Sequence, residues 1–333
     1  MKTKIIAEIG VNHNGDIKLA KELIDVAKEC GADIAKFQTF KPDKLTTTYA
    51  SKTNYQNKNT KYQNQLEMLN DLELSNEKFL ELKSYCDLKQ IEFLSTGFDS
   101  ESIEFLNKLN MKRWKIPSGE ITNLPYLRKI ASFSQPIILS SGMSYLSDIE
   151  RALKILEENG TKREMITILH CSSEYPASIK NVNLKAMQTI EKAFNVSVGY
   201  SDHTKGILVP VTAIALGAKV IEKHLTLSNN LPGPDHKASA EPNVFKNMVE
   251  SIRQIELALG NGIKNPTKEE IENSKLVRKS LVALRDIKIG DYFSEDNIGC
   301  KRPGTGITPF LFDEFIGKKS KKSYKKDELI NFQ

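Results

Sequence analysis

Short apolar runs alternate with amphipathic segments along the first 260 residues of the chain. Runs of this length, rich in Ile, Val and Phe, are typical of strands that are buried on both faces. The predicted strands are residues 4–11, 33–39, 91–96, 113–116, 136–140, 165–171, 196–200 and 219–224.

The segments between these strands carry apolar residues at helical spacing. The predicted helices include residues 17–30, 77–89, 102–109, 148–159, 184–194, 207–216 and 245–259. Ser147 is the predicted N-cap of the helix at 148–159. Strand–helix units repeated eight times predict an α/β fold, a closed (β/α)8 TIM barrel that takes up residues 1–262. A doubly wound open sheet is the alternative.

Two stretches depart from this alternation. Residues 41–73 are rich in Asn, Gln, Thr and Lys, so we expect a loop outside the core that acts as a lid or substrate loop. Beyond the barrel, the sequence predicts a linker at 263–276 and a small, mostly β or irregular domain at 277–333. A domain of this size is expected to depend on docking against another part of the protein.

Composition and charge narrow the classes of function. The 333 residues are 39% hydrophobic and 27% charged, as in ordinary globular proteins. We expect a cytoplasmic protein without a membrane partner, because no apolar run is long enough to span a bilayer and residues 1–5 lead directly into a strand. The net charge of +6 comes without a basic face interleaved with aromatics, which argues against nucleic-acid binding. The four scattered cysteines are predicted to be reduced and without chemical function.

Polar residues cluster where each predicted strand ends. Because the carboxyl ends of barrel strands meet at one mouth, we expect these side chains to form a catalytic cup. His203 and His224 end two neighbouring strands. Two neutral imidazoles can hold a divalent cation and leave coordination positions open. A pair of hydrogen-bonded core histidines is the alternative.

Eight short motifs occur in the same order as in bacterial sialic acid synthases, and the chain resembles this N-acetylneuraminate (nonulosonate) synthase family from Ile6 to Leu329. The motifs are AEIGVNHNG at 7–15, KFQT at 36–39, KIPSGE at 115–120, SSGM at 140–143, YSDH at 200–203, IEKH at 221–224, GPD at 233–235 and KRPG at 301–304. The resemblance implies a TIM barrel followed by an antifreeze-like (SAF) domain, which in this family closes the barrel of the other subunit in a domain-swapped homodimer.

The resemblance also implies roles for individual residues. His203 and His224 would bind the cation, Mn²⁺ in most relatives, with Mg²⁺ or Co²⁺ as alternatives. The phosphoenolpyruvate positions are Lys36, Thr96, Lys115, Ser118, Ser140, Ser173 and Ser201. The sugar positions are Glu8, Gln38, Glu120, Tyr175, Asp235 and Arg302. The expected catalytic residues are Glu8, Lys115, Glu120 and Glu222.

The reaction implied is the condensation of phosphoenolpyruvate with N-acetylmannosamine and water, which yields N-acetylneuraminate and phosphate. The water would be delivered by the cation or by a carboxylate such as Glu222 or Glu120. The alternative within the family is an N,N'-diacetyllegionaminate synthase that uses 2,4-diacetamido-2,4,6-trideoxymannose. More distant alternatives are a phosphoenolpyruvate-dependent synthase of a keto-sugar phosphate and a non-enzymatic carbohydrate-binding protein.

Overall fold

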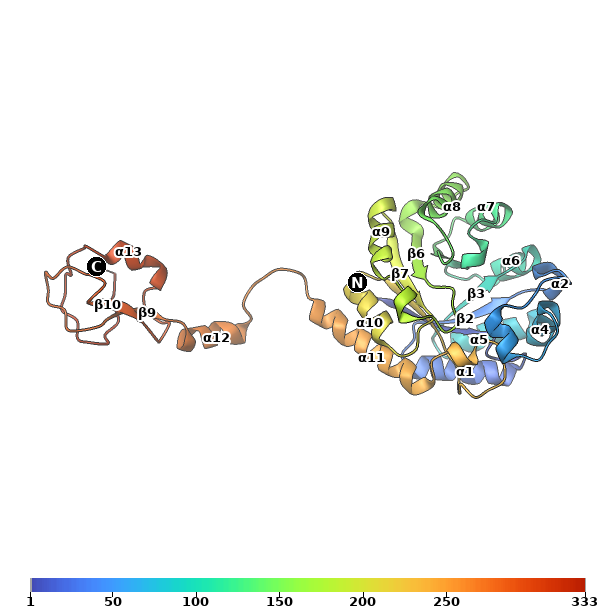
Figure 1. Cartoon of the computed structure of the whole chain (residues 1–333), viewed down its shortest axis with the longest axis horizontal. Coiled ribbons are helices and arrows are strands. Elements are labelled where there is room, and N and C mark those ends of the chain that lie inside the picture. The colour runs from blue at the N-terminus through green and yellow to red at the C-terminus, as the bar shows by residue number, and fades with distance from the viewer. Residues whose placement is uncertain (1, 333) are drawn as a thin grey trace. The chain divides into compact units, whose positions relative to one another are not determined.

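The chain forms two compact units, Met1–Gly260 and Asn261–Gln333, in a computed structural model that describes residues 2–332. The first unit is built on eight parallel strands (Figure 1). They are β1 (Lys4–Gly10), β2 (Ile34–Thr39), β3 (Glu92–Gly97), β4 (Trp114–Ile116), β5 (Ile137–Ser140), β6 (Ile166–Cys171), β7 (Ser197–Asp202) and β8 (Val220–His224).

The order of these strands is β3-β2-β1-β8-β7-β6-β5-β4, and every hydrogen-bonded pair is parallel. The two ends of that order, β3 and β4, lie in contact, so the sheet curves round into a barrel. The predicted TIM-barrel fold is therefore confirmed, and the open doubly wound sheet is not formed.

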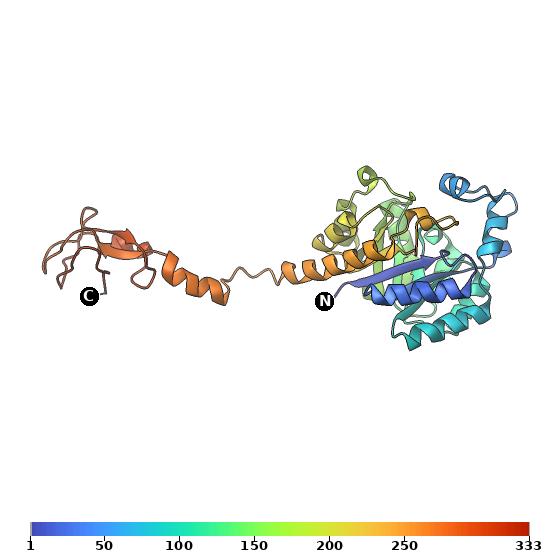
Figure 2. The ribbon, with the colours of Figure 1, turned by 90° about the horizontal axis from the view of Figure 1, so that it is seen from below.

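Helices surround the barrel on its outside (Figures 1 and 2). Each buries an apolar stripe, as in α1, where Leu23 and Ile24 face the core and the Asp16 side chain caps the first turn by accepting from the Lys18 N–H. The helices are α1 (Ile17–Glu29), α5 (Asn76–Leu88), α6 (Ser100–Asn107), α7 (Leu124–Ala131), α8 (Leu146–Glu158), α9 (Lys185–Phe194), α10 (Leu208–Ala215) and α11 (Pro242–Leu259).

The start of α8 corrects the predicted N-cap. The cap residue is Tyr145, whose backbone N–H donates to the carboxylate of Asp148 at 2.8 Å. This acceptor draws the helix start toward the N-terminus, so Ser147 lies inside the first turn. The assignment of Ser147 as N-cap was wrong.

The segment 41–73 is also more ordered than expected. It contains α2 (Pro42–Leu45), α3 (Asn54–Asn59) and α4 (Gln65–Leu72). Three apolar residues of α4, Met68, Leu69 and Leu72, are buried against Val11 and Phe40 in an apolar cluster of their own. The expectation that this segment lies wholly outside any core was wrong, because these three residues share one helix face.

The second unit begins with α12 (Lys268–Val277), whose Thr267 cap accepts from the Glu270 N–H, so part of the predicted linker is helical. It continues with the antiparallel pair β9 (Ser280–Ala283) and β10 (Ile298–Lys301) and the short helix α13 (Phe312–Phe315). Its own core includes Leu281, Phe293 and Ile330.

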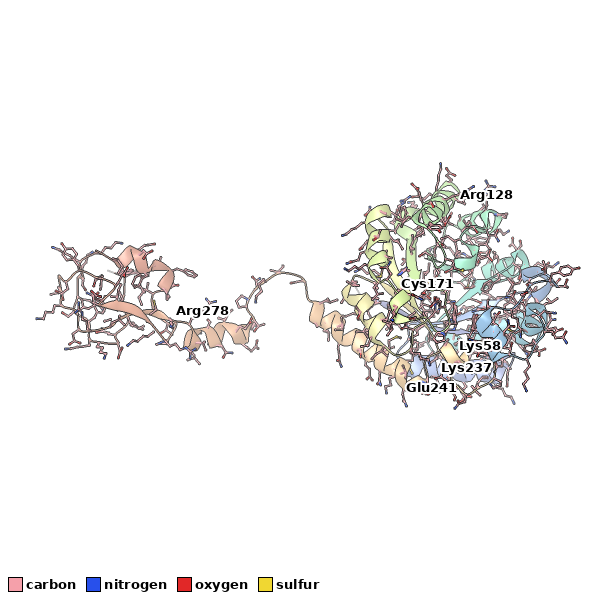
Figure 3. All side chains as sticks on the ribbon, in the orientation of Figure 1. Lys58, Arg128, Cys171, Lys237, Glu241 and Arg278 are labelled. Atoms are coloured by element: carbon pink, nitrogen blue, oxygen red, sulfur yellow. The ribbon has the colours of Figure 1, made fainter. Side chains whose placement is uncertain are left out.

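All four cysteines are unpaired, and Cys171 lies among the side chains inside the first unit (Figure 3). Between residues 2 and 332, no helix combines the length and the apolar character needed to cross a membrane.

Candidate active site

A cavity of about 330 Å³ lies at the carboxyl ends of the barrel strands. Each strand delivers polar side chains to it, because residues at or just after a strand end face the barrel mouth. The structure brings together fourteen residues that the sequence nominated. They are Glu8, Lys36, Gln38, Thr96, Lys115, Ser118, Ser140, Ser173, Tyr175, Ser201, His203, Glu222, His224 and Asp235.

Two lysines and two carboxylates alternate across the cavity. The Nζ of Lys36 lies 2.7 Å from Glu8 Oε2 and 3.7 Å from Glu222 Oε2. The Nζ of Lys115 lies 3.8 Å from Glu222 Oε1. All four side chains are less than 10% exposed. Charges buried this deeply persist only when each has a partner of opposite charge. Glu222 meets this condition because it lies between both lysines.

The two carboxylates have opposite proton affinities. Burial raises the pKa of Glu8, and the neighbouring charge of Glu222 adds to the rise against the attraction of Lys36. Burial also disfavours ionised Glu222, but Lys115 and Lys36 outweigh it and lower the pKa of Glu222. Burial lowers the pKa of Lys115. Glu222 is therefore the stronger acid of the two, and Glu8 is the carboxylate with the higher affinity for a proton.

Hydroxyl groups line the same region. Ser140 Oγ accepts from Lys115 Nζ at 2.7 Å, and Ser201 Oγ donates to Glu222 Oε1 at 3.1 Å. Thr96 Oγ1 is buried and has no hydrogen-bond partner in the described chain. An unpaired buried hydroxyl beside two ammonium groups is ready to donate to an oxyanion.

Gly142 keeps space open between two of the serines. Its N–H donates to Ser118 Oγ at 2.9 Å. A Cβ at this position would lie 2.3 Å from Ser173 Oγ and 2.9 Å from Ser118 Oγ. No side chain can be placed at such distances without moving the serines. We therefore infer that glycine is needed here because it leaves room for the two serine hydroxyl groups.

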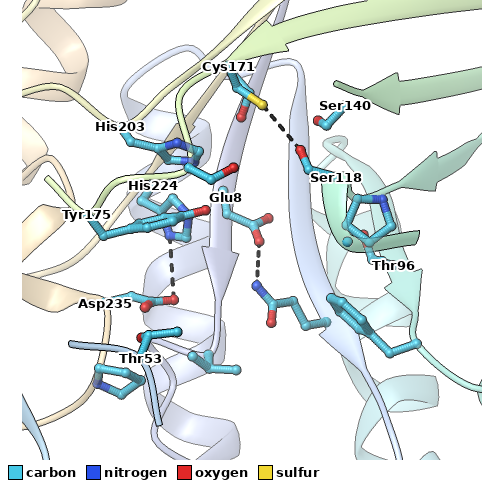
Figure 4. A pocket seen from close by; sticks show the side chains of 18 of the residues that line it. Glu8, Thr53, Thr96, Ser118, Ser140, Cys171, Tyr175, His203, His224 and Asp235 are labelled. Atoms are coloured by element: carbon cyan, nitrogen blue, oxygen red, sulfur yellow. Dashed lines mark hydrogen bonds and ion pairs between the residues drawn. The ribbon is translucent and has the colours of Figure 1, made fainter. Parts of the chain in front are cut away.

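The two histidines lie next to one another on one side of the cavity (Figure 4). Their ring centroids are 5.6 Å apart. His203 Nδ1 lies 2.7 Å from the Ser172 carbonyl, which can only accept, so Nδ1 carries the proton and Nε2 keeps its lone pair. His224 Nδ1 is buried without a hydrogen bond to any residue that the structure describes. Burial lowers the pKa of both imidazoles.

These features suit a divalent cation, which binds neutral imidazoles, and the Ser172 carbonyl also fixes the ring of His203. Residues 2–332 contain no cluster of three or more His, Cys, Asp or Glu side chains placed to hold a metal ion. His203 and His224 would therefore supply two ligands and leave the remaining positions to substrate oxygens and water.

Asp235 borders the same space. Its Oδ2 lies 3.9 Å from His224 Nδ1 (Figure 4). Burial, assisted by the negative charge of Glu8, raises the pKa of Asp235 to about 7. Its neighbour Pro234 is linked to α3, because Asn59 Nδ2 donates to the Pro234 carbonyl at 2.9 Å.

Aromatic rings connect the segment 41–73 to the histidines. Tyr55 of α3 stacks on Tyr175 with ring centroids 5.0 Å apart. Tyr175 in turn lies 4.2 Å from the ring centroid of His203. The sequence did not nominate Tyr55, and only the aromatic character of a residue in a long polar loop could have pointed to it.

Two nominated residues do not line the cavity. Glu120 lies in the 3-10 turn Ser118–Glu120, where its Oε2 accepts from Asn123 Nδ2 at 2.6 Å. Arg302 belongs to the second unit, is exposed, and donates from Nε to the Val277 carbonyl at 2.9 Å.

Sequence analysis also missed a buried ion pair formed by the residues that precede the two histidines. Lys223 Nζ lies 2.5 Å from Asp202 Oδ2 and donates to the Thr204 carbonyl at 2.7 Å. Asp202 and Lys223 each precede a histidine in the chain. The sequence did hold a signal for this pair: an acidic and a basic residue stand at equivalent positions of adjacent strands, each directly before a histidine. Strand alternation turns such residues away from the cavity, where they can pair with one another.

Comparison with known proteins places this cavity in a family. Residues 23–264 match the model of the NeuB family, and residues 278–333 match the SAF domain. The chain belongs to the NeuB family. The predictions of this family and of an enzyme are therefore confirmed.

Individual relatives refine the comparison. The chain is 54% identical to the N,N'-diacetyllegionaminic acid synthase of Campylobacter jejuni over 99% of both chains. It is 49% identical to the corresponding enzyme of Legionella pneumophila over 95% of this chain and 89% of that one. A crystal structure of the sialic acid synthetase of Leptospira borgpetersenii superposes with a TM-score of 0.72 at 33% identity, covering 82% and 90% of the two chains. N-acetylneuraminate synthesis, our first prediction, is supported only at the level of the family.

Proposed function

We propose that this NeuB-family chain is an N,N'-diacetyllegionaminate synthase. It condenses phosphoenolpyruvate with 2,4-diacetamido-2,4,6-trideoxymannose and water, and releases phosphate. The choice of this sugar rests on the 54% identity to a legionaminic acid synthase over 99% of both chains. Legionaminate was the alternative in our sequence analysis, and it now replaces N-acetylneuraminate as the favoured product.

The buried charges support phosphoenolpyruvate as the first substrate. Lys36 and Lys115 present ammonium groups beside hydroxyl donors that include Ser140 and Thr96. Charge-assisted hydrogen bonds of this kind are the strong contacts for phosphate and carboxylate. Glu8 and Glu222 already balance the two lysines, so a trianionic ligand needs further positive charge.

A divalent cation on His203 and His224 would supply that charge and polarise the sugar aldehyde as a Lewis acid. C3 of phosphoenolpyruvate attacks the aldehyde carbon and forms the new C–C bond. Water then adds to C2, and the resulting tetrahedral centre loses phosphate by cleavage of its C2–O bond. Glu8, with its raised pKa, is the carboxyl group suited to move a proton in these steps.

Phosphate release measured with each sugar tests the proposal. In the presence of phosphoenolpyruvate and Mn²⁺, we expect kcat/KM for 2,4-diacetamido-2,4,6-trideoxymannose to exceed that for N-acetylmannosamine by at least about tenfold. His224→Ala protein provides the blank. Equal or better turnover of N-acetylmannosamine would instead identify an N-acetylneuraminate synthase.

We also propose a domain-swapped homodimer in which Arg302 serves the barrel of the other subunit. Its support is the match of residues 278–333 to the SAF domain and the exposed side chain of Arg302. Mixing Arg302→Ala protein with His203→Ala protein should restore up to about a quarter of wild-type sites after random subunit exchange. If proven exchange restores no activity, the arginine acts within its own chain or has no role.

A further inference from the structure

We propose that the buried face of α4 forms an apolar wall that selects sugars lacking a hydroxyl group at C6. The inference rests on the proposed function, because it concerns the sugar that reacts in the same cavity. It extends that function by assigning part of the specificity to Met68, Leu69 and Leu72, residues that neither the motifs nor the charged cluster includes.

One side of the cavity is made of carbon and sulfur atoms. Val11, Phe98, Met68, Leu69 and Leu72 all line it. We call these five residues the apolar wall. Met68, Leu69 and Leu72 are 2%, 7% and 5% exposed. A hydroxyl group placed against them would lose its hydrogen bonds to water and gain none, whereas a methyl group would lose only its exposure to water.

Two polar residues near the apolar wall already have hydrogen-bond partners within the protein. Gln56 is the buried polar residue of α3 in the cavity lining, and its Oε1 already accepts from the Thr53 N–H at 2.9 Å. Thr60 Oγ1 donates to the Gln56 carbonyl at 2.8 Å and lies 4.0 Å from Met68 Sδ. Gln56 Oε1 and Thr60 Oγ1 are therefore engaged in holding α3 and are poorly placed to serve a sugar hydroxyl.

The wall is held firmly against the barrel. The backbone of α4 packs on the turn after β1 so closely that a Cβ on Gly15, whose φ is +73°, would lie 2.6 Å from the Asp71 carbonyl oxygen. Tyr62 Oη donates to Asp71 Oδ2 at 2.6 Å. A fixed wall discriminates between ligands better than one that can move aside.

The position of the wall indicates which end of the sugar meets it. The aldehyde carbon has to react beside His203 and His224, which follow or end β7 and β8. The apolar wall lies over β1 to β3, since Val11 follows β1 and the N–H of Phe98 bonds to the carbonyl of Thr39 at the end of β2. We place C6, the carbon farthest from the aldehyde in the open chain, on this side of the cavity.

Two sugars that differ only at C6 test the inference. N-acetylmannosamine and 2-acetamido-2,6-dideoxymannose share every other substituent. Wild-type protein should favour the deoxy sugar by about 10- to 100-fold in kcat/KM, the range for one hydroxyl group facing an apolar pocket. Where turnover is slow, the inhibition constants of the two sugars against the diacetamido substrate report the preference in binding.

Substitutions in the apolar wall test whether it causes the preference for the C6-deoxy sugar. Leu72→Asn and Met68→Gln should bring the ratio close to one and change the KM for phosphoenolpyruvate less than twofold. Leu72→Met should keep the ratio, because it stays apolar. Leu45→Asn is the matched control, since Leu45 packs on the same apolar cluster but does not line the cavity. It should loosen the packing of α4 without changing the ratio.

The outcomes separate this inference from the proposed function. A protein that uses the diacetamido sugar well but treats the two C6 variants equally keeps its function and refutes the apolar wall. The wall is also refuted if Leu45→Asn alters the ratio as much as Leu72→Asn. A protein that turns over N-acetylmannosamine as well as the diacetamido sugar loses the proposed function itself.

Discussion

Replacing Lys115 by Met isolates the contribution of one buried ammonium group. Lys115 is 2% exposed, donates to Ser140 and lies 3.8 Å from Glu222. Methionine keeps most of the side-chain volume and removes the charge. A charge-assisted contact contributes about 1.5 to 3 kcal/mol, so we expect kcat/KM for phosphoenolpyruvate to fall by about 10- to 150-fold.

The loss should be specific to one substrate. The KM for the sugar should change less than about threefold, because Glu222 keeps Lys36 and Ser201 as partners and the cavity retains its shape. Steady-state kinetics with each substrate varied in turn provide the assay. Lys223→Met is the matched control, since Lys223 is equally buried, is paired with Asp202, and does not line the cavity.

Both variants should lower the thermal midpoint, because each removes a cation from beside a buried carboxylate. Only Lys115→Met should act preferentially on phosphoenolpyruvate. Equal losses for both substrates, or the same pattern in Lys223→Met, would show that Lys115 acts only through the fold.

Three further predictions follow from other parts of the structure. His224→Ala should reduce turnover by at least about 10³-fold and abolish the rise in thermal midpoint that Mn²⁺ gives the wild type; an unchanged rise would exclude a ligand role. Gly142→Ala should raise the KM for phosphoenolpyruvate at least about tenfold through its clash with Ser173, whereas a Cβ at Gly119 meets nothing within 4 Å and Gly119→Ala should behave as wild type. Burial lowers the pKa of His13 to about 3, so only the unfolded chain takes up this proton below about pH 6.5. His13 alone should therefore contribute a decrease in the free energy of unfolding of about 1.4 kcal/mol per pH unit as the pH falls below 6.5, and urea titrations of His13→Asn should show a shallower decrease than those of the wild type.

The barrel and most of the cavity could be predicted from local patterns. Lys36, Lys115 and His224 lie in or at the ends of apolar runs, and parallel strands bring their carboxyl ends to one mouth whatever the loops do. Which of the carboxylates line the cavity was harder to predict from the sequence. Glu120 and Glu222 both come at or soon after a predicted strand, but only the three-dimensional path of the turn after Ile116 shows that Glu120 bonds to Asn123 and does not line the cavity.

A lid or substrate loop was expected at 41–73, but the packing of this segment on the barrel could not be predicted, because its partners are far away in the sequence. The apolar residues of α4 are few, and their burial depends on Val11 and Phe40. Tyr55 likewise becomes part of the site only by stacking on Tyr175. Periodicity within a short polar segment carries no information about such distant contacts.

The double role of α4 has an evolutionary consequence. Met68, Leu69 and Leu72 line the cavity and also anchor the helix to the barrel through Val11 and Phe40. A lineage that drifted toward a sugar with a C6 hydroxyl group would therefore weaken the attachment of its own α4 with the same substitutions. Compensating changes elsewhere in the cluster would have to accumulate first, so substrate preference in such a protein should change in coordinated steps rather than through single mutations.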